Sequence, residues 1–266
     1  MNALPVPEQD SARRREDVLR ELNLYPLWQR RQSAAPAVTD MAVQAVLPEA
    51  DPVQVAALAM PPSSAPATPE VSQLGWAALK QQVKDCTACS LRAGCTQTVF
   101  GAGAERADWL FVGSWPTEYD DMQGQPFAGP PGQLLDNMLA AIGLKRGENV
   151  YLSNVVKCTG SITRGPQPAQ IAQCAPYLSR QIALLQPKLI VALGHATATA
   201  LLGEDREWSS LRGMVHDFRA REKAPQHEPI PLIITHHPAA LLLSPLNKAQ
   251  TWRDLCLARD TMQGLV

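Results

Sequence analysis

Four cysteines have a spacing that suits a metal centre. Cys86 and Cys89 form a C-x2-C pair, and Cys158 and Cys174 lie far downstream with 15 residues between them. Four thiolates that converge on one point can hold an iron–sulfur cluster, and C-x2-C supplies two of them from a single turn. A structural zinc ion uses the same ligands, although the second pair here is far wider than a zinc-finger pair. The spacing therefore predicts a metal site and leaves zinc and a cluster open.

Two polar residues near the ends of apolar runs could bind a planar polar ligand. Asn154 stands inside an apolar run, so its amide must be hydrogen-bonded or it costs stability. A nucleobase edge would suit its donors and acceptor, and a partner in the core or in a turn is the alternative. His237 ends another run, where a neutral imidazole can donate to an oxygen that gains negative charge. A helix cap or a satisfied surface group is the alternative for this histidine.

A glycine- and proline-rich loop between these positions carries further candidates. Phe127 in this loop is either a stacking platform or an anchor to the core. Asp120 and Asp121 could place a carboxylate near a water, whereas two acids in a loop are usually just solvated.

The elements that must position these residues alternate between strand and helix patterns. Buried parallel strands are predicted at Trp109–Gly113, Asn149–Lys157, Leu189–Gly194 and Leu232–His236. Helices are predicted at Gly132–Ile142, Ala169–Leu185, Ala196–Leu202 and Lys248–Met262. This alternation predicts an α/β domain of three layers, α/β/α, with a central four-stranded parallel sheet. Loops at the carboxyl ends of parallel strands form the ligand crevice in such folds.

The composition divides the chain into three zones. We predict a short N-terminal amphipathic, partner-binding segment at 1–32 and an Ala/Pro-rich disordered linker at 33–73. The globular domain is predicted at 74–266. The net charge of −1 means that any contact with DNA must be a local patch, because bulk attraction to DNA usually needs a basic protein.

The compartment is expected to be the cytoplasm. No run approaches the roughly 18 apolar residues that cross a bilayer, and the polar N-terminus lacks the apolar core of a signal peptide. In that reducing compartment the cysteines are expected to be metal ligands or free thiols rather than disulfides. Cys95 and Cys256 have no obvious partner and are predicted to be plain thiols.

Several motifs in one order resemble the type-4, iron–sulfur uracil-DNA glycosylases. The resemblance spans Val83–Met262 and includes C-TA-C-SL, QTVFGAG, WLFVG, G-QPF-x-G-x-x-GQLLD, NVYLSNVVKC, QPKLIVALG, LRGMVH and HHPAALL. It implies a [4Fe–4S] cluster on the four cysteines of the metal site. It also implies an enzyme that flips deoxyuridine out of DNA and hydrolyses its glycosidic bond, as in base excision repair.

The resemblance also implies roles for individual residues. Phe127 would stack on the uracil, Asn154 would read its polar edge, and His237 would stabilise negative charge on a uracil oxygen. Asp120 falls where the family has a carboxylate that helps to position or activate water. Gly113 and Ser114 of the first motif would belong to the substrate-binding site; these positions are read from the segment GSWPT.

The sequence departs from the family pattern at several positions. The first motif, roughly G-E-A/G-P-G in the family, has Ser114 in place of an acid and Trp115 in place of a small residue. Asp120 is one methylene shorter than the usual glutamate, and His236 replaces a frequent tyrosine. The stretch TGSITRGPQP lacks an early arginine and a double proline. Loss of one well-placed electrostatic group costs on the order of 10²–10³ in rate, so activity is expected to be reduced.

The N-terminal segment suggests a second function. Arg20–Arg31, RELNLYPLWQRR, resembles the N-terminal peptide of the psi subunit of bacterial DNA polymerase III, which binds the clamp loader. An apolar helix ahead of a long linker could dock in a partner's groove. The alternative to a glycosylase is therefore a non-catalytic replisome adaptor, and a weaker third possibility is a sensor that holds uracil without cutting.

Overall fold

The computed structural model describes residues 70–160, 165–219 and 228–265. The predicted N-terminal segment, its proposed clamp-loader contact and nearly all of the predicted linker lie outside these residues. Those expectations stay predictions. Within the described ranges, no helix is long and apolar enough to cross a membrane.

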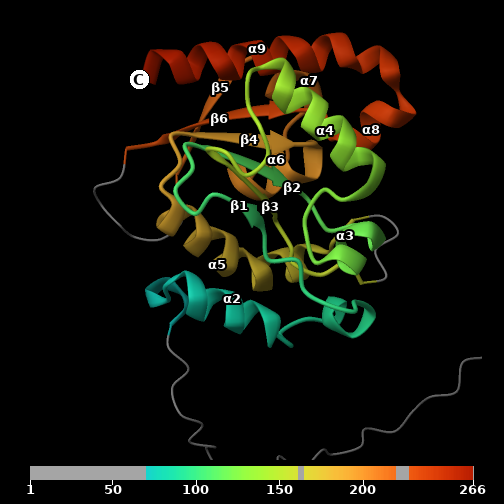
Figure 1. Ribbon diagram of the computed structural model, residues 1–266, viewed down its shortest axis with the longest axis vertical. Coiled ribbons are helices and arrows are strands. Elements are labelled where there is room, and N and C mark those ends of the chain that lie inside the picture. The colour runs from blue at the N-terminus through green and yellow to red at the C-terminus, as the bar shows by residue number, and fades with distance from the viewer. Residues whose placement is uncertain (1–69, 161–164, 220–227, 266) are drawn as a thin grey trace, which may run out of the picture. The chain divides into compact units, whose positions relative to one another are not determined.

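A six-stranded sheet forms the centre of the domain, in the order β1-β3-β2-β4-β6-β5 (Figure 1). The bounds of the strands are β1 Ala102–Gly103, β2 Trp109–Gly113, β3 Val150–Asn154, β4 Leu189–Leu193, β5 Val215–Phe218 and β6 Ile230–Thr235. The parallel pairs β3–β2, β2–β4 and β4–β6 confirm the predicted central strands. The antiparallel edge strands β1 and β5 were not predicted, because β1 has two residues and β5 is largely exposed and lacks an apolar run.

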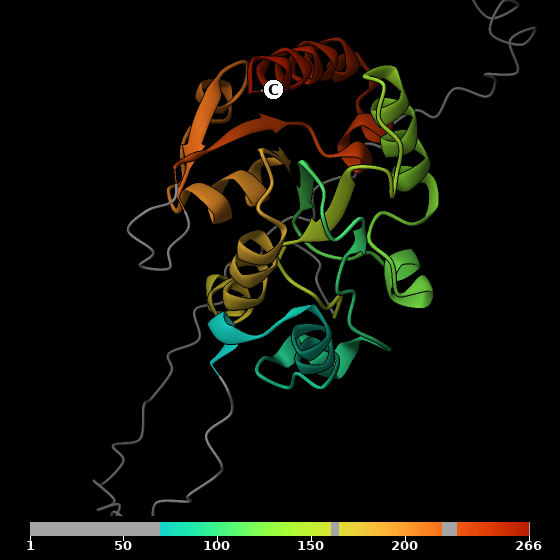
Figure 2. The same cartoon turned by 60° about the vertical axis from the view of Figure 1, so that its left-hand side comes forward.

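Helices cover both faces of the sheet (Figure 2). The bounds are α2 Trp76–Lys84, α3 Glu118–Gln123, α4 Gly129–Ala141, α5 Pro168–Leu185, α6 His195–Leu202, α7 Trp208–Leu211, α8 Pro238–Leu243 and α9 Lys248–Leu265, with single 3-10 turns at Val71–Gln73, Ser90–Gly94 and Pro245–Asn247. α4, α8 and α9 pack on one face, α5, α6 and α7 on the other, and α2 lies against the outside of α5. The three-layer architecture is thus the predicted one.

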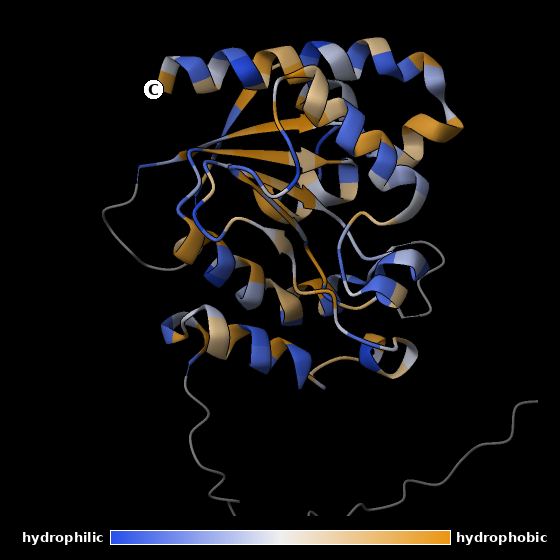
Figure 3. Cartoon of the chain, in the orientation of Figure 1, coloured by the Kyte–Doolittle hydropathy of each residue, from blue (hydrophilic) through white to orange (hydrophobic). Residues whose placement is uncertain are grey.

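The alternation of side chains along the central strands assigns them to the two faces. Phe111 packs with α4, α8 and α9, whereas Leu110 and Val112 pack with α5 and α6. The central strands are accordingly mostly hydrophobic, while the helices carry polar residues on their outer surfaces (Figure 3). By the same alternation, Asn154 at the end of β3 faces the α4 side and Ser153 faces the α5 side.

The loop after β2 contains a short helix, α3, that was not predicted from the sequence. Thr117 caps α3: its hydroxyl accepts the backbone N–H of Asp120 at 3.3 Å, and the Asp120 carboxylate accepts the N–H of Thr117 at 2.8 Å. This reciprocal arrangement is a capping box. The helix ends at Gly124, whose φ of 68° is the left-handed conformation that glycine adopts without strain.

Candidate active site and cysteine pocket

Two strand ends meet an aromatic ring at the carboxyl edge of the sheet. Gly113 and Asn154 are partners in the parallel pairing of β2 with β3. A Cβ atom placed on Gly113 would lie 2.3 Å from Asn154 Oδ1 and 2.7 Å from Phe127 Cζ. Only glycine therefore lets the amide and the ring approach this closely, and the predicted site residues Gly113, Phe127 and Asn154 do come together.

The amide of Asn154 is unpaired within the part of the chain that the structure describes. The side chain is 2% exposed, and neither Nδ2 nor Oδ1 makes a hydrogen bond with any described residue. A buried amide without partners costs on the order of 1–3 kcal/mol, so proteins seldom leave one in place. The alternative that the core or a turn satisfies Asn154 is wrong. The amide is instead available for a ligand.

Phe127 is held in an uncommon backbone conformation. Its φ is 56°, which a bulky residue adopts only when its surroundings impose it. Arg146 donates to the carbonyl oxygens of Pro126 and Phe127, each at 3.0 Å, and it pairs with Asp136 at 2.8 Å. A Cβ atom on Gly132 would lie 1.7 Å from the Phe127 oxygen, so this glycine is needed for the same turn. The ring is buried, and its orientation is fixed from several sides.

Asp120 is one of these fixing groups. Its Oδ1 accepts the N–H of Ala128, the residue after Phe127, at 2.5 Å, while its other oxygen caps α3. Burial raises the pKa of Asp120, although the N–H donors of Thr117 and Ala128 act to lower it. The expectation of a solvated loop acid is wrong for both Asp120 and Asp121, which are buried.

Asp121 ties the same helix to the segment that follows the first cysteine pair. Its carboxylate accepts the backbone N–H groups of Thr96 and Gln97, both at 2.9 Å. Burial acts to raise the pKa of Asp121, but the donors from Gln97 and Thr96 together lower it. α3 thus holds the Phe127 loop with one acid and the cysteine segment with the next.

His237 is the second residue after β6, and its ring lies beside Phe127. The two ring centroids are 5.7 Å apart, with planes inclined at 32°. The backbone N–H of Ala239 donates to His237 Nδ1 at 3.2 Å, so this histidine caps α8. Since Nδ1 accepts, the proton of the neutral ring sits on Nε2, where it can be donated. Burial lowers the pKa of His237 to about 4, which keeps the ring neutral at physiological pH.

The first motif departs from the family pattern at Ser114 and Trp115, and these two residues have different surroundings. Ser114 is half-buried, and its carbonyl oxygen accepts the N–H of Val156 at 3.2 Å. Trp115 packs with the hydrophobic cluster on the α5 side, and a Cβ on Gly165 would lie 3.5 Å from its ring. Phe127 belongs to the cluster on the α4 side. Trp115 therefore does not fill the space beside Phe127 and Asn154.

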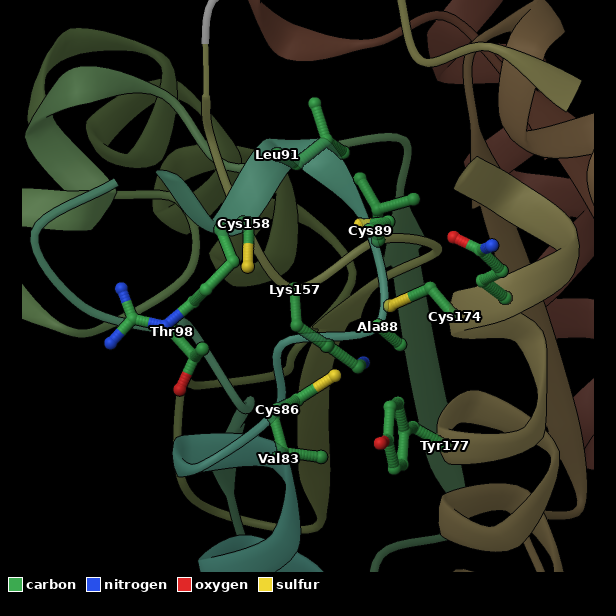
Figure 4. Close-up of a pocket in the computed structure, with 13 residues that line it drawn as sticks. Val83, Cys86, Ala88, Cys89, Leu91, Thr98, Lys157, Cys158, Cys174 and Tyr177 are labelled. Atoms are coloured by element: carbon green, nitrogen blue, oxygen red, sulfur yellow. The ribbon is translucent and has the colours of Figure 1, made fainter. Parts of the chain in front are cut away.

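The four predicted cysteines line one cavity on the α5 side of the sheet (Figure 4). Cys86 and Cys89 come from the segment after α2, Cys158 follows β3, and Cys174 lies on α5. Burial raises the pKa of the Cys158 thiol, and Cys95, Cys174 and Cys89 raise it further. The shared cavity brings the four thiols to one place, and Cys95 packs in the same hydrophobic cluster as Cys158.

Comparison with known proteins identifies the family. Residues 100–258 match the Uracil DNA glycosylase superfamily. The chain belongs to this superfamily. It is 36% identical over 169 residues to a type-4 uracil-DNA glycosylase from Archaeoglobus fulgidus, covering 62% of this chain and 82% of that protein. The type-4 uracil-DNA glycosylase from Thermotoga maritima is 37% identical over 172 residues, which cover 64% of this chain and 84% of that protein. That from Sulfurisphaera tokodaii is 38% identical over 172 residues, covering 63% and 76%.

The superfamily match includes Gly113, Phe127, Asn154 and His237, but it begins after Cys86 and Cys89. The cysteine pocket therefore needs its own chemical argument. In the described part of the chain no three His, Cys, Asp or Glu side chains are close enough to hold one metal ion. A zinc site needs its sulfurs around a single ion at about 2.3 Å. A cluster instead binds each thiolate through a different iron atom, so four thiols spread around a cavity suit it better.

Two residues at these sites were not predicted from the sequence. Arg146 lies in a polar loop with no pattern that marks it as the anchor of the Phe127 turn. Lys157 was placed only as the end of a predicted strand. It is buried between Val156 and Cys158, and burial lowers its pKa to about 8. A lysine that follows an apolar run and precedes a predicted metal ligand was the available signal.

Proposed function

We propose that this protein excises uracil from DNA by hydrolysing the N-glycosidic bond, and that its four pocket cysteines hold a [4Fe–4S] cluster. The observation that carries the proposal is the buried, unpaired amide of Asn154. It lies against Phe127 at the sheet edge of a chain from the uracil DNA glycosylase superfamily. Uracil offers adjacent carbonyl and N–H groups, which match the donor and acceptor of one amide.

The site favours a base that has left the double helix. Enzymes that act on a nucleobase rotate it out of the stack and read its polar edge in a pocket. The ring of Phe127 supplies a stacking face, and its strained turn is fixed by Arg146 and Asp120. Asn154 supplies the hydrogen bonds that tell uracil from bases with other edges.

His237 supports departure of the base. When the bond between the sugar carbon C1′ and uracil N1 breaks, its electron pair goes to the uracil ring and spreads onto the carbonyl oxygens. The Nε2–H of neutral His237 donates to such an oxygen. A water oxygen forms the new bond to C1′ and loses a proton, and in the overall balance the uracil anion gains one.

The carboxylate of Asp120 serves first to position the Phe127 loop. Both of its oxygens already accept a backbone N–H, from Thr117 and Ala128. The predicted contact with the attacking water would use a remaining lone pair, and it stays a proposal. Ser114 is uncharged, so the chain offers less stabilisation to a positively charged sugar than an acid at that position would.

The proposed cluster has a structural part in this scheme. Hydrolysis of a glycosidic bond transfers no electrons, and the four cysteines come from three separate stretches of the chain. The cluster, when bound, would cross-link these stretches. Asp121 then connects the cysteine segment to α3 and so to the loop of Phe127.

An apolar surface near His237 suits contact with the opened DNA. Leu243 ends α8, the helix that His237 caps, and Leu246 lies in the next 3-10 turn; they are 86% and 93% exposed. Apolar side chains that enter between base steps are a common device of proteins that distort DNA. We propose that these leucines contact the duplex beside the flipped nucleotide.

Single-turnover excision on a uracil-containing single-stranded oligonucleotide tests the proposal. Iron-replete protein is expected to give an abasic product, and His237→Ala is expected to lower the rate on the order of 10²–10³-fold. His216→Ala, a half-buried histidine of edge strand β5, is the matched control. If iron-replete wild-type protein at high excess gives no product, the glycosylase proposal is wrong and the replisome adaptor becomes the better hypothesis.

The change Ser114→Glu examines the missing acid. A carboxylate at this position is expected to raise the excision rate by about tenfold or more, because it stabilises positive charge on the sugar. Thr117→Glu, four residues from the strand end, is not a suitable control because Thr117 caps α3. The control is Glu118→Gln, on the exposed face of α3, which changes the local charge but leaves position 114 unchanged. A rate for Ser114→Glu at or below wild type would contradict the assigned role of position 114.

A further inference from the structure

Lys157 is a buried ammonium group at the boundary between the cysteine pocket and the base-reading strand. Its side chain is 1% exposed, and it lines the same cavity as the four cysteines (Figure 4). Its Nζ donates to Ser153 Oγ at 2.7 Å, to the Asn154 carbonyl oxygen at 2.8 Å and to Gln181 Oε1 at 2.7 Å. All three donors of the ammonium group are therefore used.

These three acceptors are neutral. None of the ion pairs found among residues 70–160, 165–219 and 228–265 includes Lys157. Buried lysines are nearly always paired with an opposite charge, because desolvation of an isolated ammonium group is expensive. Hydrogen bonds to neutral oxygens reduce this cost, but they do not neutralise the charge.

The cysteine pocket offers the missing negative charge. Cys174 and Cys158 line the same cavity as Lys157. Four thiolates that hold a [4Fe–4S] cluster would carry more negative charge than its irons and sulfides balance. The charge of the cluster, its hydrogen bonds and its surroundings in turn set how readily it is reduced and how firmly it is held.

We infer that Lys157 is the buried counter-charge of the iron–sulfur cluster, and that it links the cluster pocket to Asn154 through the Asn154 carbonyl. The inference rests on the proposed cluster. It assigns Lys157 as a positioning residue: it touches the backbone of the base-reading residue and faces the metal pocket, but not the substrate. The three hydrogen bonds of its ammonium group tie the end of β3 to α5.

The test compares Lys157→Met, which keeps the length and removes the charge, with Lys84→Met. Lys84 is exposed and lies two residues before Cys86, so it controls for charge near the cysteine loop. Anaerobically purified proteins are compared by iron and sulfide content, by visible absorbance, by the rate of iron release to a chelator and by reduction potential. Lys157→Met is expected to release iron on the order of tenfold faster and to have a more negative potential, because loss of a nearby positive charge disfavours the added electron. Lys84→Met is expected to match wild type.

Two further variants keep the test decisive. Lys157→Arg retains the charge and is expected to retain the wild-type iron-release rate far better than Lys157→Met. If the Lys157 variants do not fold, Gln181→Glu adds a carboxylate to an intact Lys157, and it is expected to shift the potential in the negative direction.

The outcomes separate the two proposals. Wild-type protein that binds no iron would overturn both the cluster and the role of Lys157. Wild-type protein with a cluster whose iron release and potential are unchanged in Lys157→Met, or in Gln181→Glu, would overturn only the role of Lys157. Equal effects of Lys157→Met and Lys157→Arg would also overturn it, since charge would then not be the cause.

Discussion

Two regions at the carboxyl end of the sheet treat buried polar groups in opposite ways. We call one the base edge, formed by Gly113, Phe127, Asn154 and His237. The other, the β6 support, surrounds the end of β6, the strand that precedes His237. It consists of Arg212, Thr235, His236, Thr251 and Asp254. Among the described residues, the base edge leaves an amide without partners, whereas the support pairs its polar groups.

The contacts of the β6 support converge on Asp254. Its carboxylate is 2% exposed and accepts from Thr235 Oγ1 at 2.7 Å and from Arg212 Nη2 at 2.6 Å. The neighbouring His236 shares a hydrogen bond of 3.1 Å with Thr251 Oγ1. These contacts fix the end of β6 against α7 and α9. The difference indicates that polar groups with hydrogen-bond partners hold β6 in place, while the amide of Asn154, unpaired among the described residues, is available to bind a ligand.

The largest expected effect is on stability, in the β6 support. Asp254→Ala removes the acceptor of two Arg212 donors, Nε and Nη2, and of the Thr235 hydroxyl. Loss of one partner of a buried ion pair costs about 3–5 kcal/mol, and we expect a fall of this size in the free energy of unfolding. Chemical denaturation monitored by circular dichroism measures it. The control is Asp260→Ala, which removes an exposed pair with Arg259 and should cost at most about 1 kcal/mol.

A change at the base edge should show the reverse, with a large effect on activity and no loss of stability. Asn154→Ala is expected to lower kcat/KM for uracil excision on the order of 10²-fold, because the base loses its hydrogen-bonding partner. Its stability should equal or exceed that of wild type, because a buried amide without partners is removed. Asn137→Ala, on the exposed surface of α4, is the matched control. A loss of stability as large as that of Asp254→Ala would show that the two regions do not differ as proposed.

Much of this architecture could be predicted from the sequence, since buried strands and amphipathic helices leave periodic patterns. The four central strands and the three layers follow from those patterns. The edge strands do not, because β1 is too short and β5 too polar to carry an apolar pattern. The helix α3 escaped for a related reason, since its six residues contain no apolar repeat.

The site was predictable in its residue types but not in its contacts. Gly113, Phe127, Asn154 and His237 stand where strands and loops end, so the topology brings them together. That Asn154 lacks a partner depends on every neighbour within reach, which no local pattern contains. The anchoring of Phe127 by Arg146 depends on a distant loop in the same way.

The smallest expected effect, counted per pH unit, is the change in the free energy of unfolding with pH. The folded protein holds the pKa of His237 near 4, below its ordinary 6.5, because burial disfavours the charged ring. Between these values the unfolded chain binds a proton that the folded chain does not. The free energy of unfolding should therefore fall by up to about 1.4 kcal/mol per pH unit as the pH drops from 6.5 towards 4. Above pH 6.5 the ring is neutral in both states, so the full stability is present there.

Comparing wild type with His237→Gln isolates that contribution, since glutamine can still accept the N–H of Ala239 but does not titrate. Denaturation curves from pH 7 to pH 5 should diverge, with wild type losing more stability. His236 of the β6 support also has a lowered pKa, chiefly through burial, so His236→Gln should reduce the slope in the same direction. The two histidines should differ in catalysis alone: excision by wild type should show no step near pH 6.5, and only His237→Gln should lower the plateau on the order of 10²-fold. Parallel denaturation curves, or equal losses of activity in both variants, would remove the distinction between the base edge and its support.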